Sequence, residues 1–141
     1  MNKRFFKFAR EASQQATYHG TKNFHPAIGA VAVYKGSIVA SASNSNKTSP
    51  LQAKYNVYRY SDVNTLAKAH AETNLIHKLR WKFGDSLDWS RVYIYLYREY
   101  KDGSLAPSRC CPSCIQMLKE LGVKKIFYTT EDGYAEENLI I

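Results

Sequence analysis

The sequence predicts an α/β fold, a three-layer α/β/α sandwich around a mixed sheet of about five strands. Stretches with the apolar spacing of an amphipathic helix alternate with short apolar runs of strand length. Two early runs flank a tight turn, which indicates a hairpin. Later, helices and strands alternate one by one, which predicts parallel pairing with helices over both faces. We expect the 141 residues to form a single domain, because a chain of this length encloses one core.

The first half of the chain predicts a helix, a hairpin and a loop. In order, these are a helix over Lys3–Tyr18, strands over Ile28–Tyr34 and Ser37–Ala42, and a loop over Ser43–Pro50. Small and apolar residues recur at helical spacing in the first stretch, as at Phe5 and Ala9. Lys35-Gly36 lies between the two strands and is a turn signal, whereas the segment after them is polar and ends in Pro.

The second half predicts two helices, each followed by a strand. In order, these are a helix within Asn64–Leu79, a connection over Asp85–Ser90, a strand over Val92–Tyr97, a loop over Tyr100–Arg109, a helix from Pro112 to before Gly122, and a strand over Lys125–Thr129. Pro suits the first turn of a helix and Gly the position after its last turn, which sets the bounds of the second helix. The tail from Glu136 is too short to assign.

Composition excludes several classes of protein. Apolar residues make up 45% and charged residues 23%, which is typical of a folded, water-soluble domain. No apolar run approaches the roughly 20 residues that cross a bilayer, and Met1–Arg4 is followed by no apolar signal segment. We therefore expect a cytoplasmic protein without a membrane partner. The net charge of +8 and eleven Tyr suit phosphates, from a nucleotide to a single strand, although a solvated basic surface is the alternative.

Three cysteines within five residues give the strongest local signal. Cys111 and Cys114 are separated by two residues, and Pro112 between them indicates the start of a helix. There the helix dipole and free N–H groups favour thiolates, which zinc binds. Taken alone, this spacing also fits a redox pair or half of a structural zinc site. A four-thiol site is excluded, because Cys110 is the only other cysteine.

His70 and Glu72 form the second signal. Residues two apart in the middle of a helix point to roughly opposite sides, because each residue turns the helix by about 100°. The two side chains can therefore face one site only if His70 lies at the start of its helix. Taken alone, this pair also fits an ordinary pair of surface residues. Together with Cys111 and Cys114, however, it offers one imidazole and two thiolates, which leaves a fourth zinc position open for catalysis.

The combination resembles the cytidine deaminase superfamily. The signature of these zinc deaminases is H-x-E followed by P-C-x-x-C, and here it reads His70-Ala71-Glu72 and then Cys111-Pro112-Ser113-Cys114. The order of elements also agrees, so the resemblance covers about Lys3 to Thr130. It implies Zn²⁺ held by His70, Cys111 and Cys114, with Glu72 as the proton shuttle. The implied reaction is hydrolytic deamination of a cytosine-type base, in a nucleoside or a nucleotide such as deoxycytidylate, and family members often form homo-oligomers.

The resemblance also suggests substrate-binding residues. Asn44 follows the second strand, as does the family's Asn that binds a sugar hydroxyl, and Asn46 is its rival. The backbone at Ala71 could meet the base edge, and Tyr128 lies where family members can stack on the base. Cys110 stands where the family usually has Pro, so its thiol could lie in the substrate pocket or compete for zinc.

Two other functions stay open. The first is deamination of cytosine or adenine within single-stranded DNA or RNA, which the charge of +8 and the Tyr-rich strand support. The segment Arg98–Arg109 is longer than in compact free-nucleotide deaminases; it could shape substrate choice or be a solvated hairpin extension. The second is a non-enzymatic zinc or nucleic-acid-binding module. Loss of the proton shuttle would mark such a module, but Glu72 is present.

Overall fold

The chain builds one mixed β-sheet between helices. The computed structural model describes residues 1–15, 27–45, 47, 49–58 and 69–140. Within them the strands are β1 (Ile28–Tyr34), β2 (Ser37–Ser43), β3 (Val92–Arg98), β4 (Lys125–Thr130) and β5 (Gly133–Asn138), in the spatial order β2-β1-β3-β4-β5. Only β3 and β4 are parallel, and the other neighbours are antiparallel. The predicted mixed sheet of about five strands is therefore confirmed.

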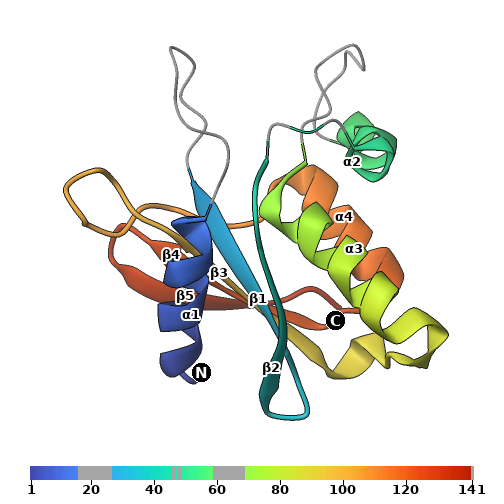
Figure 1. The fold of residues 1–141 in the computed structure, drawn as a ribbon. Coiled ribbons are helices and arrows are strands. Elements are labelled where there is room, and N and C mark those ends of the chain that lie inside the picture. Colours follow the sequence, from blue (N-terminus) through green and yellow to red (C-terminus); the bar gives the residue numbers. More distant parts are fainter. Residues whose placement is uncertain (16–26, 46, 48, 59–68, 141) are drawn as a thin grey trace.

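Helices cover both faces of this sheet (Figure 1). The helices of the described residues are α1 (Arg4–Ser13), α2 (Pro50–Tyr55), α3 (Ala71–Phe83) and α4 (Pro112–Leu121), with short 3₁₀ turns η1 (Asn56–Tyr58), η2 (Gly84–Ser86) and η3 (Trp89–Arg91). The blue helix α1 lies over one face, and α3 and α4 lie side by side over the other. Helix α4 connects the parallel strands β3 and β4, as a crossover must. The three-layer sandwich is confirmed.

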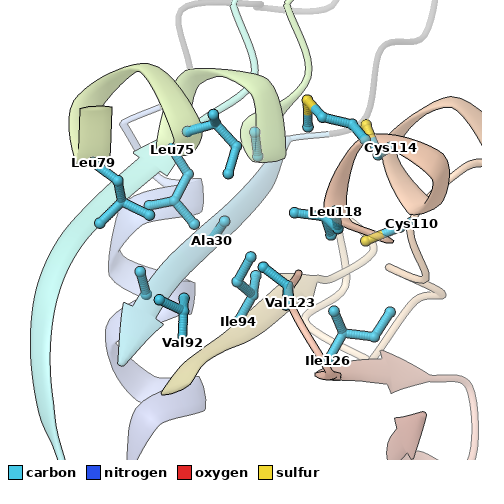
Figure 2. Packing of buried hydrophobic residues seen from close by; sticks show 14 of the residues in the cluster. Ala30, Leu75, Leu79, Val92, Ile94, Cys110, Cys114, Leu118, Val123 and Ile126 are labelled. Atoms are coloured by element: carbon cyan, nitrogen blue, oxygen red, sulfur yellow. The ribbon is translucent and has the colours of Figure 1, made fainter. Parts of the chain in front are cut away.

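The larger core fills the space between the sheet and the pair α3 and α4. Leu75 and Leu79 of α3, Leu118 of α4, and Ile94 and Ile126 of the sheet belong to one buried cluster (Figure 2). All five side chains are buried. Burial of this apolar area stabilises the relative position of the two helices, at about 25 cal/mol for each Å² removed from water. The residues in the first turns of α3 and α4 are thereby held in fixed positions.

A second core joins α1 to the opposite face. Tyr95 of β3 stacks on Phe127 of β4 with ring centroids 4.3 Å apart, and Phe6 of α1 meets Tyr95 edge-on. Tyr95 and Tyr97 are both buried here. These two members of the Tyr-rich strand therefore serve the core, and they lend no support to nucleic-acid binding.

Several element boundaries differ from the prediction. Helix α1 ends at Ser13, and residues 16–18 of its predicted span lie outside the described residues. Helix α3 starts only at Ala71, since His70 is extended, and residues 64–68 of its predicted span also lie outside the described residues. Helix α2 and strand β5 were not predicted. Strand β5 is a half-exposed edge, Gly-Tyr-Ala-Glu-Glu-Asn, so no apolar run marks it.

None of the helices in the described parts of the chain is long and apolar enough to cross a membrane.

Candidate metal centre

The site lies where α3 and α4 begin. His70 is the N-cap residue of α3 and Cys111 is the N-cap residue of α4. Their backbone angles are nearly the same, φ −75° and ψ 164° for His70 and φ −68° and ψ 165° for Cys111. Neither side chain caps its own helix, because both are turned toward the space between the two helix ends. Each position confirms the helix start that the motif requires.

Three donor atoms converge there. Nδ1 of His70 lies 3.5 Å from Sγ of Cys111 and 3.5 Å from Sγ of Cys114, and the three atoms lie within 4.8 Å of one another. A tetrahedral zinc ion, with bonds of about 2.0–2.1 Å to nitrogen and about 2.3 Å to sulfur, sets N···S edges of about 3.5–3.6 Å. The observed separations agree with these edges. The group therefore suits zinc in both the type and the spacing of its donors.

Glu72 lies beside this group without belonging to it. It occupies the second position of α3, two residues after His70, and is only 4% exposed. Burial raises the pKa of its carboxyl group, and the nearby charge of His70 opposes that rise. A buried carboxyl next to an open metal position is suited to moving protons.

The two thiols of this group differ in acidity. The pKa of Cys111 falls to about 3, chiefly because Cys114 donates a hydrogen bond to its sulfur, with His70 adding to the effect. The pKa of Cys114 lies well above its usual range, because the neighbouring Cys111 sulfur and burial both disfavour a second thiolate. A cation that binds both sulfurs removes this conflict.

Comparison with known proteins places the chain in a family. A family model described as the cytidine and deoxycytidylate deaminase zinc-binding region matches residues 2–130. The chain belongs to this family. Membership supports deamination of a nucleoside or nucleotide as the general activity of this deaminase, with zinc as its cofactor. No curated protein matches the chain significantly.

Solved structures share the fold of this deaminase. Cytidine deaminase from Burkholderia pseudomallei is 16% identical, with a TM-score of 0.65 over 99% of this chain and 93% of that one. The dCMP deaminase from the cyanophage S-TIM5 in its apo form is 24% identical, with a TM-score of 0.54 over 89% of this chain and 79% of that one. The same phage enzyme in complex with dCMP and dUMP is 22% identical over 89% of this chain and 78% of that one, again with a TM-score of 0.54.

Cys110, where the family pattern usually has Pro, points into the core of the deaminase. It is buried, and Figure 2 shows it beside Leu118 among the apolar side chains. Burial, and then the charge of Glu72, raises the pKa of its thiol well above the usual range. Among the described residues the metal-binding group contains His70, Cys111 and Cys114 but not Cys110. The geometry therefore gives no support to competition by Cys110 for the metal.

The remaining predicted residues lie around the site in different settings. Asn44 follows β2, and its Oδ1 accepts a hydrogen bond of 2.9 Å from the backbone N–H of Ile28. Ala71 is the first residue of α3 and is buried. Tyr128 is half-buried on β4, and its hydroxyl donates to Glu137 at 3.2 Å. Their contacts with a substrate stay predictions, and the rival Asn46 lies outside the described residues.

The long segment before the cysteines forms a compact turn. Glu99 pairs with Leu105, and the N–H of Tyr100 donates to the carbonyl of Ser104 at 2.8 Å. The tip of this turn projects away from the starts of α3 and α4 (Figure 1). Of the two interpretations of Arg98–Arg109, this geometry favours the hairpin extension.

Two polar residues that no sequence motif marks lie behind the metal group. Gln52 of α2 accepts a hydrogen bond from the N–H of His70 at 3.2 Å, and Asn56 accepts one from Ser113 at 3.3 Å. Both amide side chains are buried. They fall in a stretch without a motif, so their only available signal was two amides spaced one helical turn apart.

Proposed function

We propose that this deaminase removes the amino group of a cytosine-type base by hydrolysis. The base belongs to a free nucleoside or nucleotide, and deoxycytidylate is the first substrate to test. His70, Cys111 and Cys114 bind the zinc ion, and Glu72 is the proton shuttle. The observation that carries the proposal is the position of Glu72. It is buried next to three zinc-type donors that leave a fourth coordination position open.

The reaction replaces the C4–N4 bond of cytosine by a C4–O bond, so water and the cytosine base give the uracil base and ammonia. Bound zinc supplies the activation of water at neutral pH. The Glu72 carboxylate takes a proton from the attacking water and passes it to N3 of the base, and then carries the remaining hydroxyl proton to the departing amino nitrogen, so that ammonia leaves. Because Glu72 is shielded from solvent, its proton is passed to the substrate and not lost to bulk water.

Three further residues have proposed contacts with the substrate, and Cys110 has an indirect role. The backbone at Ala71, in the first turn of α3, meets the base edge, because first-turn N–H groups have no partner within the helix. Asn44 binds a sugar hydroxyl, for which an amide offers both a donor and an acceptor. Tyr128 lies beside the base. Cys110 shapes the inner wall of the pocket through its contact with the core.

A substrate panel on the zinc-loaded protein tests the proposal. Ammonia release is measured with cytidine, deoxycytidine, deoxycytidylate, cytosine, adenosine and guanine at equal concentration. Release from a cytosine nucleoside or nucleotide, and from neither purine compound, supports the proposal. A zinc-loaded protein that releases ammonia from none of them contradicts it and leaves the polymer substrate and the non-enzymatic module as the alternatives.

One surface favours the second candidate, deamination within single-stranded nucleic acid. A groove of about 730 Å³ lies between β2 and the outer face of α3, and its lining residues are Val39, Ala40, Ser41, His77, Lys78, Trp81 and Lys82. Trp81 is 90% exposed, and none of the lining residues is acidic. An exposed indole can stack on a base while lysines meet phosphates. Trp81 lies eleven residues after His70 in the chain, so the two residues are about 16 Å apart along the axis of α3.

The same lysines have a second role that weakens this candidate. Lys78 donates to the carbonyl of Ser41 at 2.6 Å, and Lys82 donates to the carbonyl of Val39 at 3.0 Å. They thereby cover the outer edge of β2, which natural sheets protect in this way. Binding of a cytosine-containing oligonucleotide at low salt separates the two roles. Binding that falls steeply with salt and is lost in Trp81→Ala supports the polymer substrate, and no binding at low salt rejects it.

A further inference from the structure

Neither α3 nor α4, the two helices at whose starts the metal group lies, is capped by its own N-cap side chain. Helices usually begin with Ser, Thr, Asp or Asn, whose side chain accepts a hydrogen bond from the first turn. His70 and Cys111 stand at those positions and direct their side chains to the metal group, so neither caps its helix. The free donors of both first turns therefore need partners from elsewhere in the fold.

For α3 that partner is Gln52. Its Oε1 accepts hydrogen bonds from the N–H of His70, at 3.2 Å, and from the hydroxyl of Thr73. A carbonyl oxygen has two acceptor positions, so both are used. Because the backbone N–H of His70 can only donate, the oxygen of the Gln52 amide, and not its nitrogen, must face α3. Gln52 is 1% exposed, so no water competes for these bonds.

At α4 the buried amide is Asn56, which meets a side chain of the first turn and not a backbone N–H. Its Oδ1 accepts from the hydroxyl of Ser113, which lies between the two zinc cysteines, at 3.3 Å. The same oxygen accepts from Nε2 of Gln52 at 2.9 Å. Asn56 and Ser113 are both buried. Gln52 and Asn56 thus form one continuous buried chain of hydrogen bonds that runs from the start of α3 to the start of α4.

A short segment supplies both amides. Ser49 is the N-cap residue of α2, and its hydroxyl caps the helix by accepting from the N–H of Gln52 at 3.3 Å. Gln52 and Asn56 are four residues apart, and both α2 and η1 contact α4. Figure 1 shows α2 near the beginnings of α3 and α4. The Ser49 hydroxyl also lies 3.5 Å from Nε2 of His77, which adds a second contact between α2 and α3.

We propose that Gln52 and Asn56 are positioning residues that set the spacing of the zinc ligands on α3 and α4. The hydrogen bonds described above go to the backbone N–H of His70, to the hydroxyls of Thr73 and Ser113 and between the two amides, and not to the three metal donor atoms. They act by holding the backbone of His70 and the Cys111–Cys114 turn in register with each other. Because removal of a residue that orients a metal ligand typically costs 10–100-fold in metal affinity, loss of either amide should weaken zinc binding by about tenfold or more. This inference rests on the zinc group alone and is independent of the substrate.

Zinc affinity, measured by competition with a chromogenic chelator, is the first readout. Gln52→Met and Asn56→Leu are expected to bind zinc at least about tenfold more weakly, and Asn56→Asp, which keeps both acceptor bonds, is expected to stay near wild type. Because the two amides form one chain, the double variant should lose less affinity than the product of the single losses. Val31→Ala, buried on the α1 side of the sheet, is the matched control and should keep its affinity.

The optical spectrum of the Co²⁺-substituted protein is the second readout. Altered ligand geometry changes the d–d and thiolate charge-transfer bands, whereas general destabilisation of a folded protein does not. If Gln52→Met fails to fold, the nearly isosteric Thr73→Val gives the same test in milder form. Unchanged zinc affinity and an unchanged cobalt spectrum in the folded variants would overturn the inference, as would an equal affinity loss in Val31→Ala. Zinc binding without ammonia release from any substrate would instead contradict only the proposed function.

Discussion

His70 and Cys111 occupy the same structural position in two different helices. Each is the N-cap residue, with an extended backbone, and Nδ1 of one lies 3.5 Å from Sγ of the other. This arrangement places the positive ends of two helix dipoles toward one point, where thiolates and a negatively charged reacting group are stabilised. It also explains why Glu72 can reach the site, since only at a helix start can residues two apart serve one centre.

The three cysteines are expected to differ in zinc binding. Cys111→Ser and Cys114→Ser should each weaken zinc binding by more than about 100-fold, the upper end of the loss caused by removing a residue that only supports a ligand. Cys110→Ala, a buried thiol outside the donor group, should keep full zinc occupancy and lose about 1 kcal/mol of stability. Zinc content by elemental analysis, together with urea unfolding, checks both. If Cys110→Ala alone lost its zinc, the assignment of Cys111 and Cys114 as the metal-binding thiols would be wrong.

Zinc should stabilise the folded chain. A ligand that binds only the folded state adds about 2.7 kcal/mol when its free concentration is 100 times the dissociation constant. The gain should shrink as the pH falls, because protons compete with zinc for the two sulfurs. Thermal unfolding with buffered free zinc measures this effect, with Cys114→Ser as the control. The expectation is wrong if zinc does not raise the thermal unfolding midpoint of the wild-type protein. It is also wrong if zinc raises the midpoint of Cys114→Ser by the same amount.

The close packing of α1 on the sheet depends on Gly29. A Cβ atom at this position would overlap the carbonyl oxygen of Ala9 in α1. Gly29→Ala should therefore cost about 1–3 kcal/mol or more, because backbone must move to make room. The control is Gly36→Asn in the β1–β2 turn, where nothing lies within 4 Å and Asn tolerates the positive φ. Equal unfolding free energies for these two variants would show that α1 does not sit as closely as described.

An ion pair ties the last strand to the segment before the zinc cysteines. Arg109 contacts Glu137 through two nitrogens, at 2.7 and 2.9 Å, and this contact lowers the pKa of Glu137. A lowered pKa in the folded state gives stability that is present above the unfolded pKa, about 4.3, and is lost as the pH falls below it. Glu137 is 27% exposed and Arg109 more so, so the pair should contribute only about 0.2–1 kcal/mol.

The variant Glu137→Gln tests that contribution. At neutral pH it should be less stable than wild type by this amount, and the difference should close as the pH falls from about 6 to about 3. Urea midpoints across this range provide the measurement. A difference that grows toward acid pH would contradict the assigned sign.

The sequence predicted most of the sheet because its strands carry dense apolar patterns. Val92–Arg98 and Ile28–Tyr34 are apolar on both faces, as expected for strands between two helix layers. Strand β5 could not be found in this way, since an edge strand needs only half of its residues buried. The start of α3 was predicted by chemistry and not by propensity. The reach of Glu72 required it, although the residues before His70 are compatible with a helix.

The metal group could be predicted from the sequence as readily as the start of α3, whereas the buried residues that support it could not. His70, Glu72, Cys111 and Cys114 stand out because zinc chemistry restricts residue type and spacing. Gln52 and Asn56 follow no such rule. Their role depends on two helix starts that meet in space, and any buried donor or acceptor within reach could meet the same need.

The most direct test of the central claim is ammonia release by Glu72→Gln, measured with zinc content on the same sample. The amide keeps the size of the side chain but cannot accept and return a proton. We predict full zinc occupancy and a loss of turnover of about 100-fold or more with the best substrate of the wild-type protein. Zinc-loaded Glu72→Gln that releases ammonia at the wild-type rate would contradict the assignment of Glu72 as the proton shuttle.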